Sequence, residues 1–289
     1  MIKNKPSYPF ETIGVAIAFS PRLESIIVET HRLAKLFGAK VLFIHIGKNT
    51  KEKEKRLVTL LTKHNYYELN YQTIWAEGDT VDTVLSTCKQ NIVDLLIFGA
   101  LEKENLMRYY LGSISREICR KAKCSVLVLV KPSMTPKPFR SLLVNGIEHP
   151  KTVHTLNTAL YFAKYEKSEK VAILKEIYLP ALSMAIADEN TEPEVEKIKQ
   201  ELVEEELKKL KTFVSDTDPS KLVTDIHCLV GKPGYTISQY SKEHKTDMLI
   251  MNSPDKNLNI LDRIFTHDIE YVLAKLPCNL LIVHSRVNG

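Results

Sequence analysis

The sequence predicts an α/β fold made of two tandem copies of an open, five-stranded, mainly parallel sheet with helices on both faces. One observation is the alternation of short apolar runs with segments of helical periodicity, which is typical of parallel sheets covered by helices. The other is an internal repeat, in which Gly78 pairs with Gly231 and Asp94 with Asp247 at one offset (231 − 78 = 247 − 94 = 153). A period this long is the length of a domain, whereas solenoid repeats are ~20–50 residues. The chain is therefore expected to contain one fold twice.

The first half is expected to begin with a strand over residues 12–18. Ser20 and Pro21 then supply a helix N-cap and a first-turn proline, apolar residues follow at helical spacing, and Gly38 ends the helix. Later elements follow the same alternation. Strands are predicted at Lys40–Ile46, Tyr71–Ala76, 93–98 and 125–130, and helices at 51–64, Thr80–Gln90 and about 112–122.

The second half is expected to repeat these elements after a linker. Domains are predicted at 1–133 and 139–289, separated by the proline-containing linker 134–138. Lys40 aligns with Lys170 at an offset of 130, so the second half carries an insertion of 153 − 130 = 23 residues, which falls at about 179–220. Its charged part predicts a lengthened surface helix over residues 192–214, and a partner-binding helix is the alternative.

Composition restricts the classes of function. The 289 residues carry 40 basic and 35 acidic side chains that are interspersed, unlike the basic stripe of a nucleic-acid-binding protein. No apolar run reaches the ~18–20 residues of a membrane span, and the first residues lack the apolar stretch of a secretory signal. Five cysteines without paired spacing predict reduced thiols in the cytoplasm, with Cys124 and Cys278 as small buried side chains.

The segment from residue 99 to 114 is the strongest candidate for a binding site. It follows the predicted fourth strand and ends where Gly112 and Ser113 open the last helix of the first half. Ligands of open parallel sheets bind at the carboxyl ends of strands, and free N–H groups at the start of a helix favour an anion. A Gly-Ser pair is also a common helix cap, so this pattern alone indicates either role.

Taken together, these segments resemble the universal stress protein family. The resemblance rests on the order of the strands, on Asp94-Leu-Leu-Ile-Phe-Gly, and on the closing segment from Leu111-Gly-Ser to Val130. It covers nearly all of both halves apart from the insertion, and it implies a Rossmann-like fold of the adenine nucleotide alpha hydrolase type. Nucleotide-binding members carry Gly-x2-Gly-x9-Gly-Ser/Thr around the phosphates and an aspartate at the end of the first strand.

The resemblance implies a nucleotide site in the first half at Ala18, His45, Gly99, Leu101, Glu102, Gly112, Ser113 and Ile114. Gly99, Gly112 and Ser113 match the family's pattern. Glu102 replaces the middle glycine and Ala18 the aspartate, and both changes oppose tight binding of ATP. A side chain narrows the approach of the backbone to phosphate, and a carboxylate at ~4 Å from a phosphate charge costs on the order of 1–4 kcal/mol.

The second half departs further from the pattern. Asn252 stands at the position of Gly99, Thr266 and His267 replace Gly112 and Ser113, and Ile147 stands at the position of the aspartate. No nucleotide is expected there. The remaining polar candidates match no zinc signature, and capping or surface roles are expected for His149, His154, Asp262, His267 and Asp268.

The sequence predicts a non-enzymatic stress-response protein that requires no cofactor. It contains no Walker A, GxSxG, HExxH or kinase motif. The resemblance implies an internal pseudo-dimer in which the last strands, from Val126 to Val130 and from Leu280 to Val283, cover each other's edges. A sensor that binds ATP or AMP in the first domain only is the alternative, and nucleotidyl transfer or hydrolysis is a weaker third. Further partners are a second copy of the chain or an unknown protein, with no membrane or nucleic acid.

Overall fold

The computed structural model describes residues 8–103, 108–179, 192–254 and 269–284. The first half contains β1 (Thr12–Ala16), α1 (Leu23–Phe37), β2 (Lys40–Ile46), α2 (Lys51–Lys63), a 3₁₀ turn (Tyr66–Glu68), β3 (Tyr71–Ala76), α3 (Thr80–Gln90), β4 (Leu95–Gly99), β5 (Leu101–Lys103), β6 (Arg108–Tyr110), α4 (Ser113–Lys121) and β7 (Ser125–Leu129). The second contains β8 (Ser141–Asn145), α5 (Thr152–Glu166), β9 (Lys170–Ile177), α7 (Glu192–Thr217), β10 (Asp225–Val230), α8 (Tyr235–Glu243), β11 (Met248–Asn252) and β12 (Asn279–Val283).

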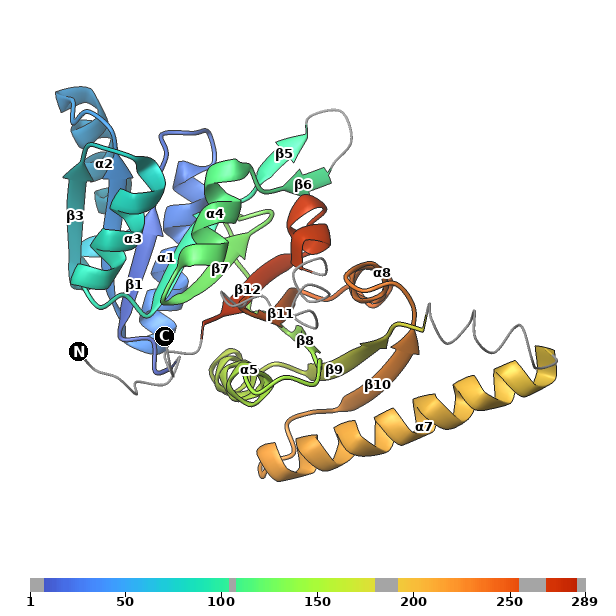
Figure 1. The fold of residues 1–289 in the computed structure, drawn as a ribbon. Helices are drawn as coiled ribbons and strands as arrows, with labels where there is room; N and C mark the ends of the chain where they lie inside the picture. The colour runs from blue at the N-terminus through green and yellow to red at the C-terminus, as the bar shows by residue number, and fades with distance from the viewer. Residues whose placement is uncertain (1–7, 104–107, 180–191, 255–268, 285–289) are drawn as a thin grey trace.

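The two halves share one ten-stranded sheet, in the order β10-β9-β8-β11-β12-β7-β4-β1-β2-β3 (Figure 1). Neighbouring strands run parallel except at the centre, where β12 pairs with β7 antiparallel and Leu281 lies opposite Leu127. This is the pairing that the sequence predicts for the last strands. It satisfies backbone groups that would otherwise form two open edges.

Helices cover both faces of this sheet, as the sequence predicts, because its inner strands are apolar on both sides. The helices α1, α2, α5 and α7 pack on one face, around residues such as Phe43 and Ile173. The helices α3, α4 and α8 and the helical residues 269–274 pack on the other, around residues such as Leu96 and Leu249. The predicted fold class is therefore confirmed. Among the described helices, none combines the length and apolarity needed to cross a membrane.

Several local predictions need correction. The first strand ends at Ala16 rather than at residue 18, and α1 begins after Arg22, so Ser20 is not its N-cap. Gly38 does end α1, with a left-handed φ of 65° that glycine adopts without strain. The predicted loop after the fourth strand contains the hairpin β5–β6. Cys124 is buried as predicted, whereas Cys278 is only partly buried.

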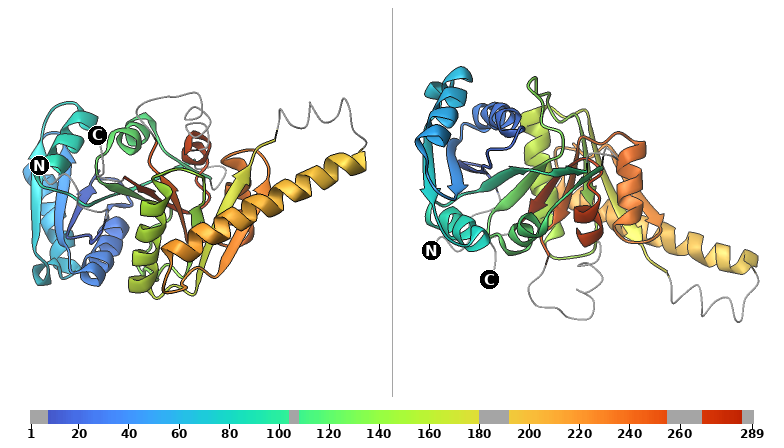
Figure 2. Two further views of the ribbon diagram at one scale, coloured as in Figure 1. Left: turned by 60° about the horizontal axis from the view of Figure 1, so that its bottom comes forward. Right: turned by 90° about the horizontal axis from the view of Figure 1, so that it is seen from above.

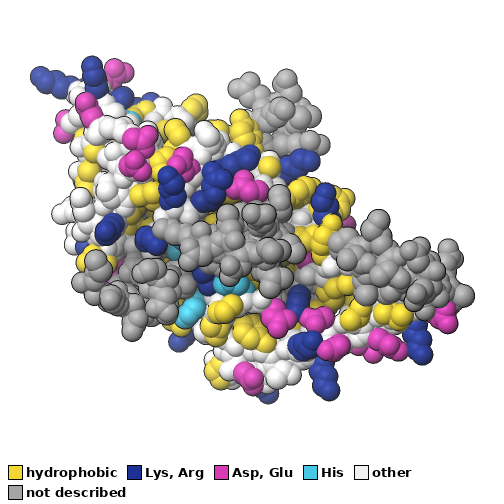
Figure 3. Space-filling model, in the orientation of Figure 1, with side chains coloured by type: hydrophobic (Ala, Val, Ile, Leu, Met, Phe, Trp, Pro, Cys, Tyr) yellow, Lys and Arg dark blue, Asp and Glu magenta, His cyan; other side chains and the backbone are white. Residues whose placement is uncertain are grey.

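The insertion contributes the helix α7, which packs along β10 and extends past the end of the sheet (Figure 2). Its acidic and basic side chains are interspersed, as on the rest of the face seen in Figure 3. The helix ends at Thr217, three residues beyond the predicted end. Leu210 and Val214 are buried and join the core beneath it.

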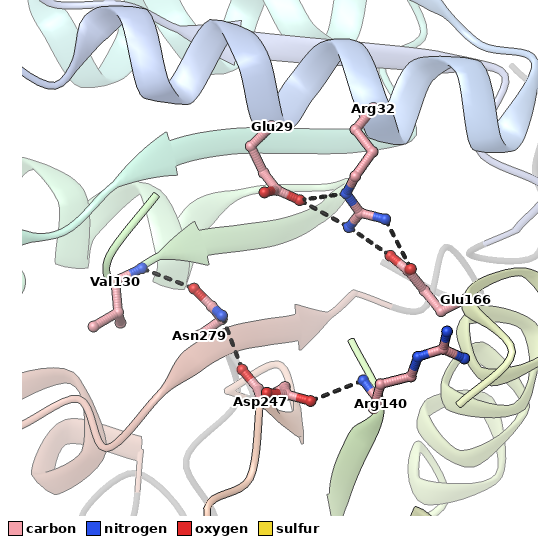
Figure 4. Close-up of polar contacts among 7 residues, drawn as sticks. All are labelled: Glu29, Arg32, Val130, Arg140, Glu166, Asp247 and Asn279. Atoms are coloured by element: carbon pink, nitrogen blue, oxygen red, sulfur yellow. Dashed lines mark hydrogen bonds and ion pairs between the residues drawn. The ribbon is translucent and has the colours of Figure 1, made fainter. Parts of the chain in front are cut away.

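The aspartates of the repeat fix the first strand of each half. Asp94 Oδ2 accepts hydrogen bonds from the backbone N–H groups of Glu11 and Thr12, both at 2.9 Å. Asp247 Oδ2 accepts the equivalent bonds from Arg140 and Ser141, both at 2.8 Å (Figure 4). The repeated aspartate is therefore a structural residue, placed at the amino ends of the strands.

Side chains also join the halves beside the central strand pair (Figure 4). Asn279 accepts from the Val130 N–H at 2.9 Å and donates to the Asp247 carbonyl at 2.8 Å. Between α1 and α5, Arg32 donates to both carboxylate oxygens of Glu166, at 2.8 and 2.7 Å, and Glu29 accepts from the same guanidinium. Burial of the Glu29 carboxylate raises its pKa. The hydrogen bond between Val130 and Asn279 and the ion pair between Arg32 and Glu166 therefore join the two halves.

Candidate functional site

The carboxyl ends of β1 and β8 are the places where the fold favours a ligand. In the sheet order β1 lies between β4 and β2, and β8 lies between β11 and β9. The helix after β1 covers one face of the sheet and the helix after the neighbouring β4 covers the other. The helices after β8 and β11 are arranged in the same way. Such an arrangement opens a crevice where open α/β sheets bind ligands. The chain therefore has two equivalent candidate sites, one in each half, and the side chains at these two edges differ.

In the first half, Arg22 bridges the crevice. It precedes α1, and its guanidinium donates to the Ala100 carbonyl at 2.9 Å and to Glu102 Oε2 at 2.5 Å. Tyr109 on β6 donates to Glu102 Oε1 at 3.3 Å, and its ring centroid lies 5.5 Å from the guanidinium carbon. Burial and the Glu102 charge raise the pKa of Tyr109. The hairpin β5–β6 is thus tied to the start of α1.

The same loop is tied to the second half. The Leu111 N–H donates to the Leu273 carbonyl at 3.0 Å, and the Leu276 N–H donates to the Tyr109 carbonyl at 3.0 Å. Arg116 and Arg120 of α4 form ion pairs with Glu270, at 3.7 and 3.3 Å. The predicted phosphate loop is therefore part of the contact between the halves.

The residues that match the glycine pattern lie around this loop. A Cβ on Gly99 would come within 2.9 Å of Ile26 Cδ1, so this glycine permits the close packing of α1 on β4. Gly112 is the N-cap position of α4 and Ser113 is its first residue, as the sequence predicts. Leu101 and Ile114 are half exposed. Glu102 lies on β5, where its carboxylate is held by Arg22.

The other two predicted residues are Ala18, which follows β1, and His45, which lies on β2. Ala18 is exposed. His45 is buried, with Nδ1 3.1 Å from the Ile17 carbonyl and Nε2 3.3 Å from Lys53 Nζ. Since a carbonyl only accepts and an ammonium only donates, these partners place the proton on Nδ1. The structure thus shows a hydrogen-bonded histidine at the end of the strand.

Phe19 fills the space beside His45. Its ring lies edge-on to His45 at 5.0 Å and stacked on Trp75 at 5.9 Å between centroids. The Lys53 ammonium and the Arg56 guanidinium each lie 5.8 Å from the centroid of the same ring. The sequence analysis gave Phe19 and Trp75 no role in a site, because the three residues come from separate segments of the chain.

The strand registers align the second half with this cluster. Thr12 pairs with Lys40 and Ser141 with Lys170, so β1 and β8 correspond at an offset of 141 − 12 = 129. Glu148 therefore corresponds to Phe19 (148 − 19 = 129), and Lys175 to His45 (175 − 45 = 130). Cys228 corresponds to Trp75 at the offset of the third strands, 228 − 75 = 153. Each aromatic ring has been replaced by a smaller or charged side chain.

A cavity of about 380 Å³ occupies this place in the second half. Lys175 Nζ donates to Glu148 at 3.1 Å and to Glu206 of α7. Burial alone would lower the pKa of Lys175, but these two carboxylates outweigh it and raise that pKa. The cavity is lined by Gly146, Ile147, Glu148, His149, Pro150, Thr152, Lys175, Lys209, Leu210 and Phe213. The sequence did not predict this cavity.

Other second-half residues that the sequence analysis considered make hydrogen bonds within their own half. Asn252, at the position of Gly99, donates from Nδ2 to Thr152 Oγ1 at 3.0 Å and accepts from the Thr155 hydroxyl. His149 Nδ1 accepts from the Lys151 N–H at 3.1 Å, and the His154 carbonyl accepts from Thr158 at 2.8 Å. Residues Asp262, Thr266, His267 and Asp268 lie outside the described residues.

Within the part of the chain that the structure describes, no three His, Cys, Asp or Glu side chains gather as a metal would require.

Comparisons with known proteins agree with this fold. A sequence model of the universal stress protein family matches residues 47–131 and 154–284. A Pseudomonas aeruginosa protein of unknown function superposes with a TM-score of 0.69 at 15% identity, over 96% of this chain and 94% of that one. A universal stress protein from Archaeoglobus fulgidus superposes with a TM-score of 0.68 at 13% identity, over 96% and 99%. No curated protein matches the sequence. At these identities the structural likeness shows the fold alone.

Proposed function

The chain belongs to the universal stress protein family, and we propose that it is a non-enzymatic stress-response protein whose first-half phosphate site is closed by its own side chains. In this proposal the two domains act as one internally paired unit. Neither half requires a nucleotide to reach its folded form.

The Arg22–Glu102 ion pair is the observation that carries this proposal. Glu102 places a negative charge beside the loop from Gly99 to Gly112, and it already pairs with Arg22, whose guanidinium binds the Ala100 carbonyl of that loop. An entering phosphate would have to displace this carboxylate or lie near it. At ~4 Å and the effective dielectric of a protein surface, that repulsion costs on the order of several kcal/mol.

The alternative is a sensor that binds ATP or AMP in the first domain. One observation favours it. Gly112 and Ser113 open α4, so the helix presents its first N–H groups beside the loop that binds Arg22. The Arg22–Glu102 pair is also partly exposed, at 28% and 36% of the two side chains, and such pairs contribute only ~0–1 kcal/mol. If Glu102 turned away, Arg22 would be available to phosphate.

Equilibrium titration with ATP and AMP separates these two functions. The wild-type protein is expected to show no binding at concentrations up to about 1 mM. Glu102→Gly restores the missing glycine and frees Arg22, so this variant is expected to gain affinity. Adding Gly112→Asp to Glu102→Gly should remove the gain, because a carboxylate then faces the phosphates. Micromolar binding by the wild type that Gly112→Asp abolishes would contradict the closed site and support the sensor.

Several sequence predictions enter this proposal unchanged. They are the domain limits at residues 133 and 139, the cytoplasmic location, and the partners, namely a second copy of the chain or an unknown protein.

Release of phosphate from ATP by the pure protein above background would contradict the non-enzymatic assignment.

A further inference from the structure

The second-half cavity exists because the aromatic cluster of the first half has no counterpart there. Glu148, Lys175 and Cys228 stand at the positions where Phe19, His45 and Trp75 pack together in the first half. Glu148 and Lys175 line the cavity of about 380 Å³. Small-molecule sites are typically ~300–1,000 Å³, so this volume is at the lower end of that range. It fits a compact ligand rather than a nucleotide.

The walls of the cavity are mostly apolar, and two ammonium groups line it. Ile147, Pro150, Leu210 and Phe213 supply hydrocarbon surface. Among the residues with full charges that line it, Lys175 and Lys209 carry ammonium groups and Glu148 a carboxylate. The Lys175 side chain is only 15% exposed, so its charge acts in the cavity with little screening by water. Both ammonium groups are paired, Lys175 with Glu148 and Glu206, and Lys209 with Glu205 and Glu206. An apolar molecule with one negative charge can therefore bind here by exchange with one of these carboxylates.

A ligand carboxylate can take the place of Glu148. The Glu148 side chain is 78% exposed, so its 3.1 Å ion pair with Lys175 is of the weak, surface kind. Glu206 also binds Lys175, with a side chain only 20% exposed, and would keep the ammonium in position during the exchange. We propose that this cavity binds a small apolar monocarboxylic acid, with its hydrocarbon body against Leu210 and Phe213 and its carboxylate on Lys175.

Calorimetric titration of the full chain with octanoate tests this proposal, with octan-1-ol as the uncharged analogue. Octanoate is expected to bind at one site and about tenfold or more tighter than octan-1-ol, because only the carboxylate forms a charge-assisted hydrogen bond. Lys175→Met should weaken octanoate binding about tenfold or more. Glu148→Gln removes the competing carboxylate and should strengthen it about two- to fivefold. Lys53→Met, at the first-half edge, is the matched control and should leave binding unchanged.

Three results would overturn the proposal: no octanoate binding at millimolar concentration, equal binding of octan-1-ol, or equal binding by the Lys175→Met variant. Should Lys175→Met fail to fold, the exposed Glu148→Gln variant and the alcohol still decide the matter. Binding that Glu148→Gln leaves unchanged or weakens would exclude exchange at Lys175. Glu148→Phe, which introduces the residue found at the equivalent first-half position, should fill the cavity and abolish binding.

Discussion

At the carboxyl ends of the strands the two halves have the same backbone arrangement, but nearly every side chain differs. Phe19, His45 and Trp75 close the first edge, whereas Glu148 and Lys175 line a cavity at the second one. At the opposite, amino ends of the strands the halves are alike, since Asp94 and Asp247 make the same two hydrogen bonds. The register is therefore fixed at one end of the strands and the site is built at the other. This separation explains how the sites diverged while the repeat kept its offset.

The largest effect is expected where the halves are most alike. Asp94→Ala should lower the free energy of unfolding by about 3 kcal/mol, because two N–H groups lose a charged acceptor. Asp247→Ala should cost about 2 kcal/mol, since the aspartate and its partners are less buried. Urea unfolding of the two variants measures both values. If only one of the two substitutions lowered the free energy of unfolding, the two aspartates would not be structurally equivalent.

The next effect should differ sharply between equivalent positions. Phe19→Ala removes a half-buried ring that contacts His45 and Trp75, and it should destabilise by about 2 kcal/mol. Glu148→Ala, at the corresponding position, should change stability by less than about 0.5 kcal/mol. Tyr67→Ala, at a side chain that is 72% exposed, is a control for loss of an aromatic ring in the first half. Similar losses at residues 19 and 148 would show that the edges are packed alike.

A smaller effect is expected at the joint between the halves. Asn279→Ala removes two hydrogen bonds, one across the central strand pair to Val130 and one within the second half to Asp247, and should cost about 1–2 kcal/mol. Ser125 corresponds to Asn279 (279 − 125 = 154), and its buried hydroxyl has no hydrogen-bond partner among the described residues. Ser125→Ala should therefore change stability by less than about 0.5 kcal/mol. Thermal unfolding of both variants tests this difference. Equal shifts of the two midpoint temperatures would contradict it.

The smallest effect is a dependence on pH that belongs to the second edge. Burial alone would raise the pKa of Glu206, but hydrogen bonds from Lys175 and Lys209 outweigh it and lower that pKa from its usual value near 4.5. A lowered folded-state pKa gives stability that is present above the unfolded value and is lost as pH falls through the folded one.

Unfolding of the wild type and of Glu206→Gln at several pH values measures this contribution. The difference in stability should be largest near neutral pH and should shrink below about pH 4.5. Comparing the two proteins cancels the opposite contributions of Glu29 and Glu176, whose pKa values are raised chiefly by burial. A difference that grows on acidification would contradict the sign.

Local patterns in the sequence predicted the scaffold well and the sites poorly. The repeat, the strand order and the pairing of the last strands follow from periodicity, register and the family resemblance. The contact between Arg22 and Glu102 joins residues 80 positions apart, and Phe19 meets Trp75 only because β1, β2 and β3 lie side by side. Such contacts leave no mark on local spacing. The cavity was missed for the same reason, since α7 supplies one wall and the segment after β8 another.

The central pairing of β7 with β12 also bears on how such a molecule changes over generations. In a pair of identical chains, every substitution appears in both copies at once. Here His45 and Lys175 occupy equivalent places in the two halves but are encoded separately, and the shared sheet holds the copies in a fixed ratio and orientation. One copy can keep its closed edge as a support while the other alters its opening. The molecule is in effect a heterodimer inherited as a single gene product.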